Sequence, residues 1–266
     1  VFKNTPNCVD SCATPGFMKD LEHVASDLEL CEKALADFLE AKRTIFPRFY
    51  FVSQVMLLDI LSNGNRPWVV LKHVNAMFQG IKEIELKGDP GTEVVTFVAN
   101  EGEKVPIDIT GSLKLKGKVE NYLNELIAKM RKEMRAKLSK TLADYDTTGK
   151  GGKERPTWLS KQPVAQLSLV TTQYQWTLQT EAALDKMQQG QKSGLEDYFK
   201  VNVDMLGDII KMVQGDLPKL LRRSAMNVIT LEAHSRDIVA KLIKEGVDTK
   251  DHFLWLGQLK TRWEKH

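Results

Sequence analysis

The sequence predicts a mainly α-helical protein, an elongated stack of helical bundles with a small β-hairpin and strand insertion. Apolar residues recur in steps of three and four over most of the 266 residues, which is the period of a helix with one buried face. A strand pattern followed by a strand–turn–strand pattern occupies residues 81–109. Several helices joined by short breaks bury their apolar faces best against one another, so we expect bundles in a row.

We expect three segments along the chain. Residues 1–80 form an N-proximal helical part, and residues 81–117 form the strand and hairpin insertion. Residues 118–266 form a C-proximal helical part.

The N-terminal part is predicted to be one loop, one long helix and one strand. Residues 1–15 carry two prolines and few periodic apolar residues, so we expect them to be loop or extended. A helix is predicted from Phe17, and Pro47 ends it because the residue before a proline disfavours helix. Residues 48–53 are rich in aromatic side chains, which predicts a short strand. The apolar stripe of the long helix comprises Leu21, Val24, Leu28, Cys31, Leu35 and Phe38.

Two further helices and a strand follow. A short helix is predicted over residues 54–61, and the turn sequence at 62–65 ends it. A second helix is predicted over residues 68–78. Residues 81–86 alternate apolar and charged side chains, which is typical of a half-buried strand.

A β-hairpin is predicted from residues 93–99 and 104–109. Pro106 cannot donate a hydrogen bond to a neighbouring strand, so we expect the second strand at an edge of the sheet. We expect the hairpin to protrude as a contact element, and its deletion to leave folding mostly intact. The residues of its tip are Asn100, Glu101, Gly102 and Glu103.

The C-terminal part is predicted to be almost entirely helical. The longest helix covers residues 119–144, with one apolar face and strongly basic positions elsewhere. A polar, glycine-rich loop is predicted at residues 147–156. The remaining helices are predicted at 163–187, at 195–223 with a break near Gly215 and Pro218, at 225–244 and at 253–263.

The basic positions at 129–140 and the aromatic residues each admit two interpretations. Glu133 interrupts the basic positions and no aromatic residues interleave, which favours a solvated face over a docking face for an acidic surface. The aromatic residues at 46–51 are interpreted as core. Trp255 and Trp263 are interpreted as core packing, with a role as interface anchors as the alternative.

Composition narrows the function classes. The net charge of +3 gives no argument for a nucleic-acid partner, and no stretch approaches the ~18 apolar residues of a membrane helix. Three cysteines are too few for a disulfide scaffold, which favours reduced cysteines in an intracellular protein. Cys8 and Cys12 could contribute half of a zinc site, but His23 is the only histidine nearby.

No catalytic or nucleotide-binding pattern emerges from the sequence. The glycine-rich stretch at 149–153 has the wrong spacing for a phosphate-binding loop, and Glu154 follows where serine or threonine is needed. We therefore expect no catalytic residue, no metal ligand and no cofactor-binding residue in this chain. His234 and Asp237 share a helix face and could form a local hydrogen bond.

Several passages, in one order along the chain, resemble the linker region of dynein heavy chains. A Lys-Arg pair ends a helix and a Phe-Pro-Arg-Phe sequence follows it, and the LLDILSNG sequence at 57–64 comes next. The amino-acid sequence at 57–64 is most similar to that of axonemal outer-arm heavy chains. The matching positions are Lys42, Arg43, Phe46, Pro47, Arg48, Phe49, Trp176, His234, Arg236, Asp237 and Trp255.

The resemblance implies a mechanical linker that converts ATP-driven changes in an AAA+ ring into microtubule-based movement in a cilium or flagellum. It implies ATP and Mg in the ring of the parent chain. It implies as partners that ring, other dynein heavy, intermediate and light chains, and microtubules through the parent chain, with no nucleic acid and no membrane. Residue 1 is Val, which suggests a piece of a longer chain. The alternative is a helical scaffold or interaction module of a cytoskeletal complex, which would not require a ring after His266.

Such a lever must be stiff over most of its length and compliant at one place. Packed helices supply stiffness, and glycine-rich or helix-breaking segments supply compliance. The candidate hinge residues are Gly88, Pro90, Gly91, Gly111 and Gly117.

Overall fold

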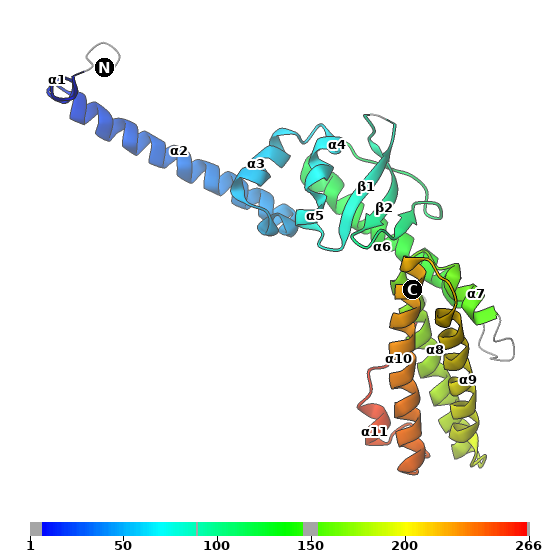
Figure 1. Cartoon of the computed structure of the whole chain (residues 1–266). Coiled ribbons are helices and arrows are strands. Elements are labelled where there is room, and N and C mark those ends of the chain that lie inside the picture. The colour runs from blue at the N-terminus through cyan, green and yellow to red at the C-terminus, as the bar shows by residue number, and fades with distance from the viewer. Residues whose placement is uncertain (1–6, 89, 146–153, 265–266) are drawn as a thin grey trace. The chain divides into compact units, whose positions relative to one another are not determined.

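The computed structural model describes residues 7–88, 90–145 and 154–264, and it is mainly helical with a small antiparallel sheet inserted among the helices (Figure 1). This confirms the fold class, while the elongated stack stays a prediction. The chain divides into two compact units. The first comprises residues 1–79 and 115–125, and the second comprises residues 80–114 and 126–266. The sheet thus belongs to the second unit, whereas the sequence suggests a separate insertion.

The described part of the first unit is entirely helical apart from its connections. The elements are α1 (Cys8–Cys12), α2 (Phe17–Ile45), the 3-10 helix η1 (Pro47–Phe51), α3 (Gln54–Ser62), α4 (Pro67–Val70), the 3-10 helix η2 (Leu71–His73), α5 (Val74–Met77) and the first turns of α6 (Val119–Ala143). The predicted helices at 17–46 and 54–61 are confirmed. The helix predicted at 68–78 consists of three short helical segments.

Two predictions for the first unit are wrong. Residues 8–12 form a helical turn because the Asn7 side chain caps it, accepting a hydrogen bond from the Val9 N–H at 3.0 Å. Residues 48–51 form a 3-10 helix and not a strand. Pro47 begins that helix with its fixed φ, and the Phe49 N–H donates a hydrogen bond back to the Phe46 carbonyl. This backbone N–H group is therefore bonded within the helix and not to a neighbouring strand.

The apolar stripe of α2 has the predicted helical period but does not form a core. Leu39 is the buried residue of this helix, and stripe positions such as Leu28 and Phe38 are exposed. The core of the first unit lies beyond the stripe, where α2 ends. Its buried apolar residues are Leu39, Phe46, Phe49, Val52, Leu57, Ile60, Val70, Leu71, Val74, Met77, Phe78, Leu115, Val119, Tyr122 and Leu123.

The sheet of the second unit is built around β2 (Glu93–Ala99). This strand pairs antiparallel with β1 (Ile81–Lys87), β3 (Lys104–Pro106) and β4 (Leu113–Lys114). The hairpin is confirmed with a shorter second strand. β3 pairs with β2 alone, as the edge position of Pro106 requires. Because β2 is central, deletion of the whole hairpin would remove the strand on which the sheet depends.

The helices of the second unit pack as a bundle in which α8 (Ala165–Gln188), α9 (Gly194–Gln214) and α10 (Lys219–Lys244) lie side by side (Figure 1). Trp176 and Trp255 meet edge to face in one core cluster, with ring centroids 5.2 Å apart. A second cluster joins α9 and α10 to α7 (Glu154–Ser160) through Trp158 and Leu159. This packing confirms the helices predicted at 163–187 and at 195 onwards.

Three details of the second unit differ from prediction. α10 is continuous from 219 to 244 because nothing after Pro218 breaks it, so the separate helix predicted from 225 is wrong. α11 (Phe253–Leu256) ends at Gly257 and does not reach 263. Residues 154–156, predicted as loop, begin α7, while 146–153 lie outside the described residues. No helix among the described residues is long and apolar enough to cross a membrane.

Two neighbouring phenylalanines of the Phe-Pro-Arg-Phe passage allow a matched test of the first core. Phe49 is fully buried and packs edge to face on Phe46, with ring centroids 4.8 Å apart, whereas Phe51 is 76% exposed. We expect Phe49→Ala to lower the free energy of unfolding by about 3–5 kcal/mol. Phe51→Ala should change it by less than about 0.5 kcal/mol. Urea unfolding measures both, and equal effects would show that Phe49 does not anchor this core.

Candidate functional site

The candidate hinge glycines lie in connections around the sheet. Gly88 and Pro90 lie in the turn between β1 and β2, and Asp89 between them is outside the described residues. Gly91 is packed so closely that a Cβ there would approach the Lys87 carbonyl oxygen to 2.4 Å. Gly111 has φ +81°, a left-handed conformation that side chains other than glycine rarely adopt. Gly117 precedes α6 with a similar φ.

The segment immediately before Gly111 is fixed to α6 by one carboxylate. Glu133, whose side chain is fully buried, accepts hydrogen bonds from the backbone N–H groups of Asp108, Ile109 and Thr110 at 3.2, 3.0 and 3.0 Å. The Thr110 hydroxyl donates a fourth bond at 2.5 Å. We call Glu133 and residues 108–110 the Glu133 anchor.

Two lysines one turn away on either side of Glu133 complete the anchor. Lys137, itself buried, places its ammonium 2.5 Å from a carboxylate oxygen of Asp108 and 3.5 Å from Glu133. Lys129 donates to the Thr110 carbonyl at 2.6 Å. The segment is therefore held by α6 through both its N–H and its C=O groups.

The bonds of the anchor keep the buried carboxylate ionised. Burial alone raises the pKa of Glu133, but the hydrogen bonds from the Thr110 hydroxyl and from the backbone of residues 108–110 outweigh it and lower the pKa to about 2. Several N–H groups that donate to one carboxylate stabilise its charged form.

The hairpin tip contacts helices of its own unit. Glu103 accepts a hydrogen bond from the N–H of Ala165, the first residue of α8, at 3.0 Å, so it caps that helix. Glu101 pairs with Arg223 of α10 at 3.7 Å. Gly102 faces Leu220, and the Asn100 N–H donates to the Gly80 carbonyl at 3.3 Å. A contact of the tip with a partner stays a prediction.

The predicted motif positions of the first unit gather around the start of α6 and the end of α2. Lys42 forms an ion pair with the buried Glu120 at 2.6 Å. Burial raises the pKa of Glu120, but the hydrogen bond and charge of Lys42, a backbone hydrogen bond and the charge of Lys118 together outweigh it, so the pKa is lowered. Phe46 and Phe49 are core, whereas Tyr50 and Phe51 next to them are exposed, against the prediction.

The two arginines of this motif, Arg43 and Arg48, lie against aromatic rings. Arg48 donates to the Met77 carbonyl at 3.0 Å and lies 4.6 Å from the Phe78 ring centroid. Arg43 lies 5.8 Å from the Tyr50 ring centroid. Pro47 is the first residue of η1.

The motif positions of the second unit separate into a buried and an exposed group. Trp176 and Trp255 are buried against each other, which favours the packing role for Trp255. His234 and Asp237 are exposed on α10. Asp237 accepts two hydrogen bonds from Arg236, at 2.9 and 2.6 Å, and among the hydrogen bonds of the described residues His234 is not its partner.

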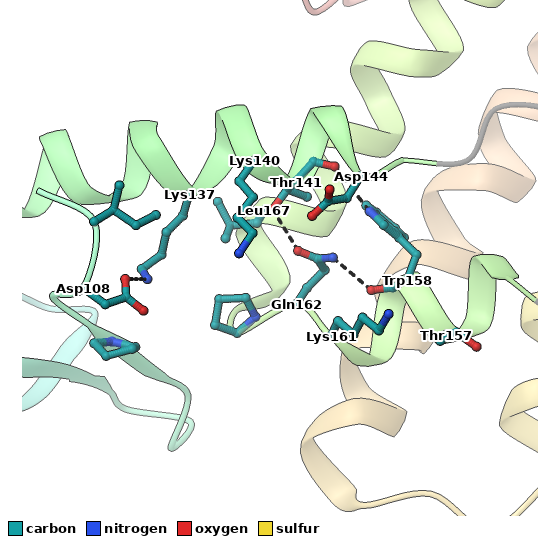
Figure 2. A pocket seen from close by; sticks show the side chains of 13 residues that line it. Asp108, Lys137, Lys140, Thr141, Asp144, Thr157, Trp158, Lys161, Gln162 and Leu167 are labelled. Atoms are coloured by element: carbon teal, nitrogen blue, oxygen red, sulfur yellow. Dashed lines mark hydrogen bonds and ion pairs between the residues drawn. The ribbon is translucent and has the colours of Figure 1, made fainter.

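A pocket of about 820 Å³ opens beside the Glu133 anchor within the second unit (Figure 2). Its walls come from the end of β3 and the following segment, from the last turns of α6, from α7 and from the start of α8. The lining residues are Pro106, Asp108, Ile109, Lys137, Lys140, Thr141, Asp144, Thr157, Trp158, Lys161, Gln162, Pro163 and Leu167.

Sequence reasoning missed the buried charged groups that organise the second unit. Glu133 is interpreted from the sequence as an interruption of a basic face, although Lys129 and Lys137 at a spacing of four on either side are a signal for an ion-pairing role. The buried ion pair of Arg155 with Glu232 joins α7 to α10, and no sequence signal singled out either residue.

Cysteines and metal ligands give no further site. Cys8, Cys12 and Cys31 are unpaired and exposed. Within the described ranges, no group of three or more His, Cys, Asp or Glu residues could hold a metal ion.

Comparisons with known proteins agree on one family. A family model described as dynein heavy chain, N-terminal region 2, matches residues 1–141. Over 99% of its own length, the chain is 39% identical to the dynein alpha chain of the flagellar outer arm of Chlamydomonas reinhardtii. Over 97% of its own length it is 36% identical to human dynein axonemal heavy chain 9. Over its full length it is 35% identical to the ciliary dynein beta chain of Tripneustes gratilla. The chain spans 6% of the length of each relative.

The Glu133 anchor predicts a specific pH dependence of stability. Because the pKa of Glu133 is depressed in the folded chain, its contribution is complete above the ordinary value of 4.5 and is lost as the pH falls toward about 2. We expect Glu133→Gln to lower the free energy of unfolding at pH 7 by about 3 kcal/mol and to flatten its slope between those pH values.

Glu125→Gln is the matched control, since Glu125 is exposed on the same helix. It should change the free energy of unfolding by less than about 0.5 kcal/mol. Urea unfolding at a series of pH values makes the comparison. An unchanged slope in Glu133→Gln would mean that the anchor does not hold the charged carboxylate.

Proposed function

The chain belongs to the dynein heavy chain family, in its N-terminal region 2, and we propose that it acts there as a segment of the mechanical linker. In this role it transmits ATP-driven changes of an AAA+ ring of the same polypeptide into microtubule-based movement. The observation that carries the proposal is the Glu133 anchor, because six polar contacts join the segment after β3 to α6, and four of them go to one buried carboxylate.

A lever needs a body that moves without deforming. In the second unit, two core clusters hold the helices together, and the tip residues Glu101 and Glu103 bind the sheet to α10 and α8. Close-packed interiors resist deformation, so the sheet and the bundle of this unit should move as one body.

A lever also needs a place where it yields. The chain passes from one compact unit to the other at residues 79–80, 114–115 and 125–126. The last crossing lies within α6, whereas Gly80 adjoins the first and the candidate hinge residues Gly111 and Gly117 flank the second. Glycines in connections absorb changes of φ and ψ at low cost, which supports compliance at the first two crossings.

The nucleotide and the location are proposals that the family and the relatives' names support. We propose that ATP and Mg bind in the ring of the parent chain, and that this chain contributes no catalytic residue. The relatives are flagellar, ciliary or axonemal by name, which supports a place in the axoneme. As partners there we propose further dynein heavy, intermediate and light chains. Microtubules would be reached through the parent chain.

A helical interaction module is the second candidate, and the exposed stripe of α2 favours it. Leu21, Val24, Leu28 and Phe38 are between 45% and 64% exposed on one face, a surface that usually meets another helix. Both functions can reside in one chain, but only the linker requires a movement that depends on nucleotide.

The linker role is tested by fluorescence energy transfer in the intact heavy chain. The exposed Cys8, Cys12 and Cys31 are changed to serine, and a donor is attached at Lys192→Cys, between α8 and α9, with an acceptor on the ring. We expect the transfer efficiency to change between the ATP-bound and nucleotide-free states.

The control pair lies within the second unit. Labels at Lys192→Cys and Lys219→Cys are separated along α9, whose 21 residues span about 30 Å, and should report a constant distance because the bundle moves as one body. A constant donor–ring distance in all nucleotide states would contradict the linker role and leave the interaction module.

A further inference from the structure

The pocket beside the Glu133 anchor combines an apolar wall with cations that have no ion-pair partner. Pro106, Pro163 and Leu167 contribute apolar surface. Lys140 of α6 and Lys161 after α7 are exposed, and their ammonium groups lie on either side of the Gln162 side chain in Figure 2. Among the ion pairs of the described residues, neither lysine has a partner.

Gln162 and Lys137, two other polar groups of the pocket, already have partners within the protein. Gln162 accepts a hydrogen bond from the Thr141 hydroxyl at 2.8 Å and donates one to the Trp158 carbonyl at 2.9 Å. The Lys137 ammonium lies against Asp108 and Glu133. For a ligand, the lysines Lys140 and Lys161 are therefore the cations of the lining that no ion pair of the described residues neutralises.

The charge continues along α6 next to the pocket. Lys132, about two turns before Lys140, is also exposed, and no ion pair of the described residues involves it. Of the two carboxylates that line the pocket, Asp108 is paired with Lys137, and Asp144 forms no ion pair within the described residues. In the lining, two lysines without an ion pair, Lys140 and Lys161, thus face one such carboxylate, and this excess of positive charge attracts an acidic partner.

We propose that this pocket docks an acidic peptide segment that carries a large apolar side chain between its carboxylates. The apolar side chain would occupy the space between Pro106, Pro163 and Leu167, and the carboxylates would reach Lys140 and Lys161. The volume of about 820 Å³ holds more than one side chain, so a small anion alone would leave the apolar wall uncovered. The docking site does not depend on the linker role.

The test is fluorescence anisotropy on the 266-residue chain with a labelled peptide of sequence Glu-Glu-Asp-Leu-Phe-Asp-Glu-Glu. The double variant Lys140→Glu/Lys161→Glu should weaken binding about tenfold or more, because each attraction becomes a repulsion. The control Lys192→Glu/Lys241→Glu carries the same change of net charge at exposed positions away from the pocket, and it should bind within about twofold of the parent chain. Circular dichroism confirms that each variant is folded.

Two altered probes separate the proposed ligand from simpler ones. Replacing Leu-Phe by Ser-Ser in the peptide should weaken binding about tenfold, because the apolar wall then stays uncovered. Inorganic phosphate should compete only weakly. Equal binding by the double variant and the control would overturn the site. Equal binding of the two peptides, with full displacement by phosphate, would show a general anion site and overturn the peptide proposal.

Discussion

One buried carboxylate organises the second unit. Taking an isolated charge out of water costs several kcal/mol, so a buried glutamate persists only where partners replace its hydration. Glu133 obtains them from three backbone N–H groups, one hydroxyl and the nearby Lys137 ammonium. The exchange is mutual, because residues 108–110 follow the short edge strand β3 and would otherwise leave their N–H groups without partners. The segment after β3, up to Thr110, is thereby fixed relative to α6.

The same device recurs at the other end of α6. Glu120, buried in the first unit, binds Lys42 at the end of α2, close to the core formed by Phe46 and Phe49. α6 thus supplies one buried carboxylate to each compact unit, and each binds a segment distant in sequence. The Arg155–Glu232 pair does the same for α7 on α10. We infer that these buried ion pairs contribute more to a unique arrangement of the helices than to net stability.

Local sequence signals predict the elements well and their environment poorly. Periodicity and breakers locate α2, α3, α6, α8 and α9 because helix formation depends on near neighbours. The α2 stripe has the right period, yet Leu28 and Phe38 are exposed, since a pattern cannot show whether a partner covers it. The strand predicted after Pro47 fails for a related reason, because aromatic residues favour strands only where another strand can pair with them.

The candidate site is harder to predict than the fold. Gly111 is a recognisable turn residue, but its neighbours' partner lies more than 20 residues away on a helix whose basic character hides the role of Glu133. The tip residues Glu101 and Glu103 are recognisable as a turn, whereas their partners Arg223 and Ala165 depend on how the bundle folds. Long-range partners of this kind leave little trace in a single sequence.

Hydrogen exchange of the backbone amides at 108–110 tests the role of Glu133 most directly. If the carboxylate holds this segment, these amides exchange slowly in the parent chain. In Glu133→Gln they should become fast, while those of α9 stay protected. Fast exchange in the parent chain, or equal protection in the variant, would contradict the account and place the restraint on the sheet elsewhere.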